Sequence, residues 1–472
     1  GLLENFLETQ TKSGFIDFKP GLGGQRYHMI ATPILVEMAW KIFEATEDLS
    51  FLENVFPKLL NFVRAWFADT QDRDGDGLPE WTRPLQLGFE DHPVFSQFYP
   101  GSQGADISKI ESPSLCSFLY NEIQRLISIA QITHQASALS ALEAMAENLK
   151  SAIKASWDET DFTYRHWDRE SHFSPSGEFL GQRMGPGEIH INRQFPMPVR
   201  LSVRVSAAKD LPRTIRVFIH GTGPSGNYLI ERLEVEQFRW HIDRGSGSSE
   251  RIYTTIENIE VIGVANEDQI SVEVIDFSII DHTLLLPLWA GIPDKTRAHD
   301  LVTNTVLNPE KFWKTFGILA CPSETKPDGH SGFSVHMIWN TLIGEGLLKY
   351  GFRKETAELV TRLMQAVILN LKKNQSFFNY YHPDSGHGWG ERNTIGGLAP
   401  IKLFLDTLGV RVISPTKVLV QGKNPFPWPV TIRFRGLIVN REAHTTRITF
   451  PGGQSAIVKS EDPRIITLEE IT

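Results

Sequence analysis

Cysteine is scarce in this chain: only Cys116 and Cys321 occur among its 472 residues. The two lie far apart and show no metal-type spacing. The sequence therefore indicates neither a disulfide framework nor a cysteine-based zinc cluster, and it leaves a single bridge open.

Long apolar runs and basic runs are also missing. The apolar stretch 275–289 is interrupted by Asp276, Asp281 and His282 and falls short of the ~20 residues of a membrane helix. The net charge is -9, and no run of Lys or Arg offers a phosphate-tracking surface. These absences exclude a membrane span and argue against a nucleic-acid partner.

The composition is that of a soluble globular protein, with a mean hydropathy of -0.20, long enough for a core domain with appended modules. Aromatic residues are plentiful (11 Trp, 9 Tyr and 29 Phe), and aromatic rings stack on sugar faces as well as filling cores. The chain opens at Gly1 without an initiator Met or a visible signal peptide. We therefore expect missing upstream residues, and the cytoplasm rather than secretion. The oligomeric state stays open.

Hydrophobic periodicity divides the chain into helical and strand-rich parts. Apolar residues recur three or four apart at Ile34, Leu35, Met38 and Ile42, and further helices are predicted over 113–132, 136–157, 334–350, 354–373 and 398–408. The period changes to two in 201–205, 215–219, 270–274 and 430–434, which predicts strands.

We therefore predict a multidomain α and β protein. Its expected parts are a first helical part over 1–172, an inserted β-sandwich domain over 173–280, a second helical part over 281–411 and a C-terminal β module over 412–472. The inserted domain could bind glycans, shape the rim of a cleft or mediate self-association.

An acidic loop follows the early helices, in the segment Asp72-Arg-Asp-Gly-Asp-Gly-Leu-Pro-Glu-Trp81. Asp72, Asp74 and Asp76 take positions 1, 3 and 5 and Glu80 takes position 9, an oxygen-rich pattern typical of Ca²⁺ loops. Arg83 stands where an EF-hand has its closing Glu. A structural calcium site and a solvated acidic turn are both compatible with the pattern.

Two further clusters carry groups suited to sugar chemistry. Gly88-Phe-Glu-Asp-His-Pro93 places two carboxylates among apolar neighbours, and 379–393 combines glycines with Trp389, Glu391 and Arg392. Glycoside hydrolysis requires one protonated carboxyl and a second carboxylate. Alone, the first cluster is more typical of surface decoration, and the second is more typical of a glycine-rich turn between two helices.

In this order, the clusters resemble the trehalase and processing α-glucosidase I superfamily, specifically glycoside hydrolase family 63 and its bacterial mannosylglycerate-hydrolase relatives. The resemblance covers 1 to about 170 and 281–410. It rests on the two early motifs and on Leu286-Pro-Leu-Trp-Ala-Gly291, Gly346-Leu-Leu-Lys-Tyr-Gly351 and Tyr380-Tyr-His-Pro-Asp-Ser-Gly386. It implies an (α/α)6 barrel, a toroid of six helical hairpins, and an inverting glycosidase acting on an α-linked glucoside or mannoside without an organic cofactor.

The resemblance also implies catalytic roles. It places the general acid on Glu90, where the family usually has Asp, with Asp91 as the competitor. The family's general base, a Glu, corresponds to Asn379, which cannot accept a proton from water. Glu391 is then the first alternative base and Glu324 a second, or hydrolysis is impaired.

The substrate-binding residues are predicted from the same clusters. The family's Trp-Arg-Gly-Pro motif is replaced by Ser331-Gly-Phe-Ser-Val-His336, so we expect a different substrate. The candidate sugar contacts are Trp81, His92, His336, Asn379, Trp389 and Arg392. An α-L-rhamnosidase-like enzyme, a polysaccharide lyase and a carbohydrate-binding pseudoenzyme remain alternatives.

Overall fold

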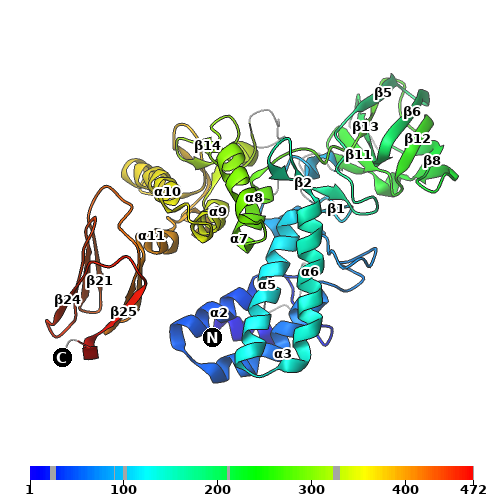
Figure 1. Cartoon of the computed structure of the whole chain (residues 1–472). Helices are drawn as coiled ribbons and strands as arrows, with labels where there is room; N and C mark the ends of the chain where they lie inside the picture. The colour runs from blue at the N-terminus through cyan, green and yellow to red at the C-terminus, as the bar shows by residue number, and fades with distance from the viewer. Residues whose placement is uncertain (22–27, 90, 99–103, 210–212, 323–329, 471–472) are drawn as a thin grey trace. The chain divides into compact units, whose positions relative to one another are not determined.

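Helices and sheets alternate along the computed structural model, which describes residues 1–21, 28–89, 91–98, 104–209, 213–322 and 330–470 (Figure 1). The fold is therefore mixed α and β. The chain divides into two compact units. The first unit comprises 1–292 with 320–333, and the second comprises 293–319 with 334–472.

The first unit opens with paired helices. Its principal helices are α1 (Leu2–Glu8), α2 (Leu35–Thr46), α3 (Leu49–Ala65), α5 (Pro113–Ile132), α6 (Leu139–Ala155) and α7 (Leu286–Ala290). α5 and α6 run side by side (Figure 1), and both confirm helices predicted from periodicity. Side chains cap the N-termini of two of these helices. Asp48 accepts a hydrogen bond from the Phe51 amide at the start of α3, and Ser112 accepts one from the Ser114 amide at the start of α5.

The start of α2 is capped from a neighbouring helix. Ile34 precedes α2 and offers no capping side chain. The carboxylate of Glu122, on α5, accepts from the amides of Val36 at 2.7 Å and Glu37 at 2.9 Å. Because these amides have no partner within their own helix, this contact fixes the register of α2 against α5.

The periodicity of α2 only partly predicts its buried face. Leu35, Val36 and Ala39 are buried, whereas Ile34, Met38 and Ile42 are 39%, 42% and 36% exposed. The expectation that those three would cover the core is wrong, because the helix packs through the adjacent stripe. Among the described helices, none has both the length and the apolar character needed to cross a membrane.

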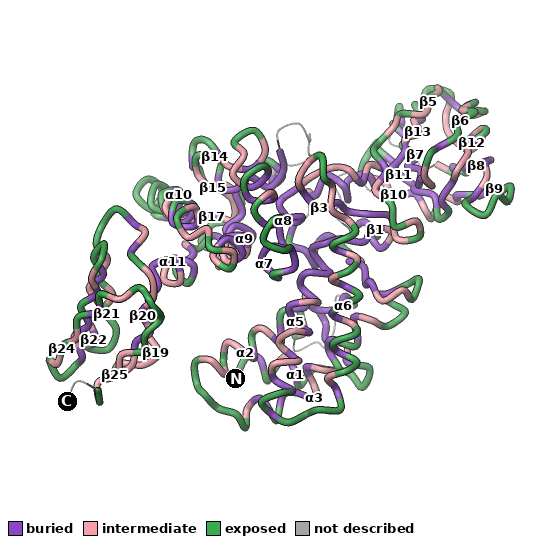
Figure 2. Tube along the Cα trace, viewed as in Figure 1, coloured by how far each residue is buried: buried purple, intermediate pink, exposed green. Residues whose placement is uncertain are grey.

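Two antiparallel sheets follow in the first unit. One has the order β10-β11-β7-β13-β5, with strands Arg239–His241, Arg244–Ser248, Leu201–Ser206, Gln269–Val274 and Phe179–Met184. The other has the order β6-β12-β8-β9, with strands Gly187–Val199, Tyr253–Ile262, Arg216–Thr222 and Tyr228–Leu233. Alternate residues of both, among them Val203, Ile219 and Val272, form one shared core. Figure 2 shows buried segments along the strands of these sheets. The alternation predicted for β7, β8 and β13 is confirmed.

The second unit combines helices with smaller sheets. Its helices are α8 (Lys295–Leu301), α9 (Met337–Lys349), α10 (Arg353–Asn374) and α11 (Ile401–Leu408). A three-stranded sheet joins β16 (Val335–His336), β17 (Phe378–Tyr381) and β18 (Gly388–Arg392). This sheet contains many residues of the predicted cluster over 379–393, which we call the late cluster.

Further sheets follow towards the C-terminus. One joins β19 (Val410–Ser414), β20 (Lys417–Val420) and β25 (Arg464–Thr467); another joins β21 (Val430–Phe434), β22 (Leu437–Arg441), β23 (Thr446–Thr449) and β24 (Ser455–Val458). They share a core with α10 and α11 residues such as Val360 and Leu403. The helices predicted over 354–373 and 398–408 and the strand predicted over 430–434 are confirmed.

Candidate active site

The acidic loop is shaped by its glycines and by hydrogen bonds to its own backbone. Gly75 and Gly77 have φ values of 74° and 84°, a region that favours glycine. Asp72 accepts from the Gly77 amide at 3.0 Å, and Asp76 accepts from the Leu78 amide at 2.7 Å. These bonds gather the carboxylates of the loop.

Two residues distant in sequence complete this cluster. The candidate ligand atoms of Asp74, Asp76, Glu111 and His172 all lie within 4.8 Å of one another, and His172 Nε2 is 3.1 Å from Asp76 Oδ2. Of the four predicted metal ligands, Asp74 and Asp76 belong to this group. Glu111 and His172 had no sequence signal linking them to the loop.

Several carboxylate oxygens in this region are buried without partners. Within the described residues, Asp72 Oδ1, Glu80 Oε2 and Glu111 Oε1 have no hydrogen-bond partner. Burial raises the pKa of Glu80 to about 8 and that of Glu111 to about 10. Buried carboxylate oxygens that receive no hydrogen bond fit a hard cation such as Ca²⁺.

The predicted acid pair is only partly within the described residues. Glu90 lies outside them. Asp91 is half-buried, and its Oδ2 accepts from Ser331 through the hydroxyl at 2.7 Å and the amide at 3.4 Å. Ser331, from the segment that replaces the family's Trp-Arg-Gly-Pro motif, therefore orients the Asp91 carboxyl.

His92 and Trp81 are buried in this structure. The His92 ring is fully buried, stacks on Phe95 at 4.0 Å between ring centroids, and has Nε2 3.1 Å from Asp281 Oδ2. Trp81 is 1% exposed and donates to Ser114 Oγ at 3.1 Å. Neither ring is available to a sugar here, which corrects the prediction. Both residues instead hold the loops that carry the carboxylates.

His92 belongs to a buried charge cluster. Asp281 Oδ2 is also 2.8 Å from His166 Nε2, and Asp281 Oδ1 accepts from the Thr283 amide at 2.7 Å. Burial alone would raise the pKa of Asp281, but His92 and His166 hold it well below its usual range. Burial lowers the pKa of His166. The cluster joins the segment after the acid motif to residues far along the chain.

An aromatic row lies on the three-stranded sheet of the second unit. His336, Tyr380 and Trp389 come from β16, β17 and β18, and Tyr380 is the registered neighbour of both others. Its ring centroid lies 4.7 Å from that of His336 and 4.7 Å from that of Trp389. His336 is 4% exposed, whereas Tyr380 and Trp389 are half-buried. We call this row the aromatic platform.

The polar members of the late cluster lie on the same strands. Asn379 accepts from the Thr394 hydroxyl. Glu391 and Arg392 are exposed, and the Arg392 guanidinium lies 5.7 Å from the Phe378 ring centroid. Glu391 stands between the registered pairs Phe378–Arg392 and Tyr380–Trp389. It is thus on the strand adjacent to Asn379, where the family's base would be. The alternative base, Glu324, lies outside the described residues.

Glycines make this hairpin possible. A Cβ at Gly388 would lie 2.2 Å from the Phe378 ring, and Gly390 has a φ of 81°. The tight approach of β17 and β18 keeps Tyr380 against Trp389.

Comparison with known proteins finds a family that is similar to part of the first unit. The family model described as "Mannosylglycerate hydrolase MGH1-like glycoside hydrolase domain" matches residues 5–187. Residues 5–187 are thus similar to an MGH1-like glycoside hydrolase domain, and we call them the MGH1-like domain. The match supports the GH63-like glycosidase that the motifs predict. The acidic loop, Asp91 and His172 all fall within the MGH1-like domain.

Solved structures share the fold of the chain. The GH63 mannosylglycerate hydrolase from Thermus thermophilus in complex with glucose is similar at a TM-score of 0.51 and 16% identity, covering 86% of each chain. Its complex with Tris and D-glycerate gives 0.52 and 14%, covering 86% of this chain and 87% of that one. A sialidase gives 0.53 and 8%, covering 92% of this chain and 33% of its own. No curated protein matches the sequence.

The aromatic platform and Glu391 lie outside the residues matched as the MGH1-like domain. Cys116 and Cys321 are buried free thiols, so the bridge left open by the sequence is not formed.

Proposed function

We propose that the protein hydrolyses an O-glycosidic bond with inversion, acting on an α-linked glucoside or mannoside of an oligosaccharide or small glycoside. The observation that carries the proposal is the pairing of the aromatic platform with Glu391 on adjacent strands. Aromatic faces bind sugar rings, and an exposed carboxylate beside them is suited to activate water. The motif resemblance and the MGH1-like domain support it.

The roles of the carboxyl groups follow from inverting chemistry. Glu90 or Asp91 protonates the leaving oxygen, and Glu391 takes a proton from the water that attacks the anomeric carbon. The bond from Ser331 fixes the orientation of Asp91. Asn379, held by Thr394, is an amide that cannot act as the base, and we assign it and Arg392 to hydrogen bonds with the sugar.

We propose the (α/α)6 toroid as the architecture of the catalytic domain. The predicted domain limits, 1–172, 173–280, 281–411 and 412–472, stay part of this proposal. The helical hairpins and the similarity in fold to mannosylglycerate hydrolase support it.

We also propose that the acidic loop holds a structural Ca²⁺ ion. Asp74 and Asp76 would bind it together with Glu111, and Asp72 and Glu80 would complete its oxygen surroundings. The unpartnered buried oxygens and the raised pKa values of Glu80 and Glu111 support the fit. Such an ion would neutralise charge and brace the loop; it takes no part in the chemistry proposed above.

The activity is tested with a panel of aryl α- and β-glycosides and with Glu391→Gln. We expect turnover of an α-glucoside or α-mannoside, with proton NMR showing the inverted β-anomer as first product. Glu391→Gln should lower kcat by about 100-fold or more with little change in binding. Glu358→Gln, an exposed carboxylate on α10 paired with Arg362, is the matched control.

Other results would point elsewhere. Release of rhamnose would indicate an α-L-rhamnosidase, and an unsaturated product absorbing in the ultraviolet would indicate a lyase. Binding across the panel without turnover would identify a carbohydrate-binding pseudoenzyme and overturn the proposal.

A further inference from the structure

The outer face of the five-stranded sheet is largely polar, with Phe179 and Met184 as exposed apolar residues on its edge strand β5. Along β7 and β13, alternate residues enter the sandwich core, and the remaining positions face outward. Registered neighbours across β11, β7, β13 and β5 form one polar row of Ser246, Arg204, Ser271 and Gln182. A second row begins with Arg244, Ser206 and Gln269. The side of the sheet away from the core thus presents hydroxyl, amide, guanidinium and carboxylate groups, together with the exposed side chains of Phe179 and Met184.

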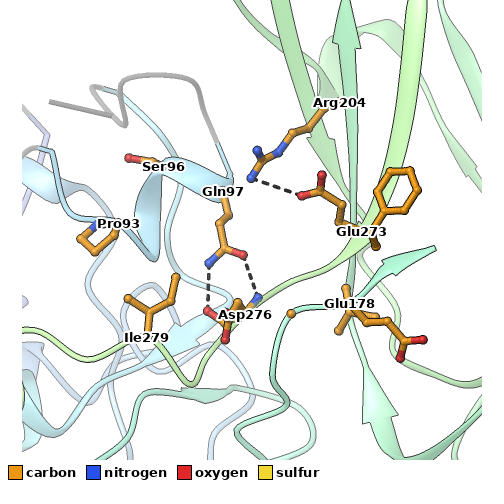
Figure 3. A pocket seen from close by; sticks show the side chains of 11 residues that line it. Pro93, Ser96, Gln97, Glu178, Arg204, Glu273, Asp276 and Ile279 are labelled. Atoms are coloured by element: carbon orange, nitrogen blue, oxygen red, sulfur yellow. Dashed lines mark hydrogen bonds and ion pairs between the residues drawn. The ribbon is translucent and has the colours of Figure 1, made fainter. Parts of the chain in front are cut away.

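This face is one wall of a groove within the first unit. A cavity of about 280 Å³ lies between the sheet and the segment that contains the short helix η1 (Phe95–Gln97) (Figure 3). A second cavity, of about 330 Å³, lies along the sheet. Both are lined by Ser96, Phe179, Arg204 and Glu273. We call the two together the sheet groove.

The opposite wall of the sheet groove is held rigidly. The Gln97 side chain donates to the Asp276 carbonyl at 2.9 Å and accepts from the Asp276 amide at 2.7 Å (Figure 3). The Gln97 carbonyl also accepts from the hydroxyls of Ser202 and Ser246, both at 3.1 Å. These bonds tie η1 to the sheet, so the groove exists before a ligand arrives and little ordering is needed on binding.

The groups along the groove suit sugar hydroxyls. Arg204 and Glu273 face each other at 3.6 Å with side chains 44% and 33% exposed (Figure 3), which offers donors and acceptors side by side. Phe179 is 58% exposed and supplies an aromatic surface. Gln269 donates to Gln182 at 3.0 Å. Glu178 and Arg244 add one charge of each sign to the lining. Hydroxyls, amides and charged groups beside an aromatic ring can hydrogen-bond to sugar hydroxyls while the ring packs on a sugar face.

We propose that the sheet groove binds a saccharide chain, through residues separate from the candidate catalytic groups. Arg204 and Glu273 hydrogen-bond to neighbouring hydroxyls, and Phe179 packs against a ring face. The sheet groove recruits polymeric or oligomeric substrate to the enzyme. The recruitment of substrate rests on the proposed function, whereas saccharide binding is measured without turnover and is tested separately from the catalytic roles.

Affinity electrophoresis of the full chain in native gels tests the proposal. The gels contain soluble starch, mannan, xylan or polygalacturonate, and a hexasaccharide of the retarding polymer is then titrated by calorimetry. We expect retardation in at least one gel, and a Kd weakened about tenfold or more by Arg204→Ala or Phe179→Ala. Neither change should alter kcat on a small aryl glycoside.

Arg216→Ala is the matched control. Arg216 pairs with Glu234 at 3.4 Å with side chains 49% and 36% exposed, but it lies on β8 of the other sheet. This variant should bind as the wild type does. Circular dichroism verifies folding, and Glu273→Gln, which keeps the side-chain volume, provides a second variant of the pair. Absence of retardation in every gel overturns the proposal, as does equal weakening by Arg216→Ala or equal retardation by dextran sulfate, a simple polyanion.

Discussion

At the scale of single residues, the aromatic platform gives the most direct prediction about substrate binding. Trp389 is half-buried and its ring lies 4.7 Å from that of Tyr380. Truncation to Ala removes a stacking surface, and the loss of an aromatic ring that stacks on a nucleic-acid base costs about 1–3 kcal/mol.

We therefore predict that Trp389→Ala raises KM about tenfold on the substrate found by the glycoside panel. Trp428→Phe, which alters an exposed Trp of the C-terminal part, should leave KM unchanged. An unchanged KM in Trp389→Ala would remove the platform from the substrate site.

The buried Asp281 makes a prediction about pH. The pKa of Asp281 in the folded chain lies below its ordinary 3.8, and that of His166 lies below 6.5. The unfolded chain therefore binds more protons than the folded chain as the pH falls below 6.5, and again below 3.8. Stability from both groups is present at neutral pH and is lost on acidification.

Asp281→Asn should lower the melting temperature at neutral pH by several degrees, because it leaves two buried histidines without their carboxylate, a loss of about 3 kcal/mol. Its further loss of stability below pH 3.8 should be smaller than that of the wild type. Thermal melts across this range measure both effects. Asp243→Asn, at an exposed Asp, should follow the wild-type curve; an identical curve for Asp281→Asn would refute the account.

At the scale of elements, the acidic loop shows what sequence reading supplies and what it leaves out. The spacing of Asp72, Asp74 and Asp76 indicated a cation loop, and the left-handed Gly75 and Gly77 accord with that reading. Glu111 is on β1 (Ile110–Glu111), and His172 follows β4 (Trp167–Asp168). These two strands are far apart in the sequence and pair with each other in the fold. No local pattern could have placed them at the loop.

We predict that saturating CaCl₂ raises the melting temperature by a few degrees over EDTA, since binding at 100 times Kd contributes about 2.7 kcal/mol. Asp74→Asn should abolish most of this shift. The neighbouring exposed Asp69→Asn should retain it. Equal melting temperatures with CaCl₂ and EDTA would exclude the ion.

The hydrophobic periodicity of the sequence predicted well which segments form helices and strands. It predicted less well which of their residues are buried. The helices near 113–132 and 354–373 and the alternating strands follow from three-to-four and two-residue spacing, because those patterns are set by backbone geometry. The sequence predicts Trp81 and His92 as sugar contacts because they lie in the two early motifs. Their burial depends on packing with Ser114, Phe95 and Asp281, partners that the local sequence does not reveal.

At the scale of the whole molecule, the chain joins an MGH1-like domain to a β-sandwich and to a second unit that carries the aromatic platform. The sequence predicts the cluster over 379–393 as functional, and Asn379, Trp389, Glu391 and Arg392 do share one small sheet. His336, predicted from the segment 331–336, lies on the same sheet. Ser331 as the partner of Asp91 was not predicted, since 240 positions separate them.

The proposed mechanism requires that separate carboxyl groups act as the general acid and the general base. The dependence of the rate on the leaving group is the most direct test of this requirement. Glu90→Gln, Asp91→Asn and Glu391→Gln are assayed on a dinitrophenyl glycoside, whose leaving group needs no proton, and on the matching unactivated disaccharide. The variant of the general acid, Glu90→Gln or Asp91→Asn, should keep its rate on the dinitrophenyl glycoside, and its rate on the disaccharide should fall about 100-fold or more. Glu391→Gln should lose its activity on both substrates. Wild-type turnover of both substrates by all three variants would contradict the proposed mechanism.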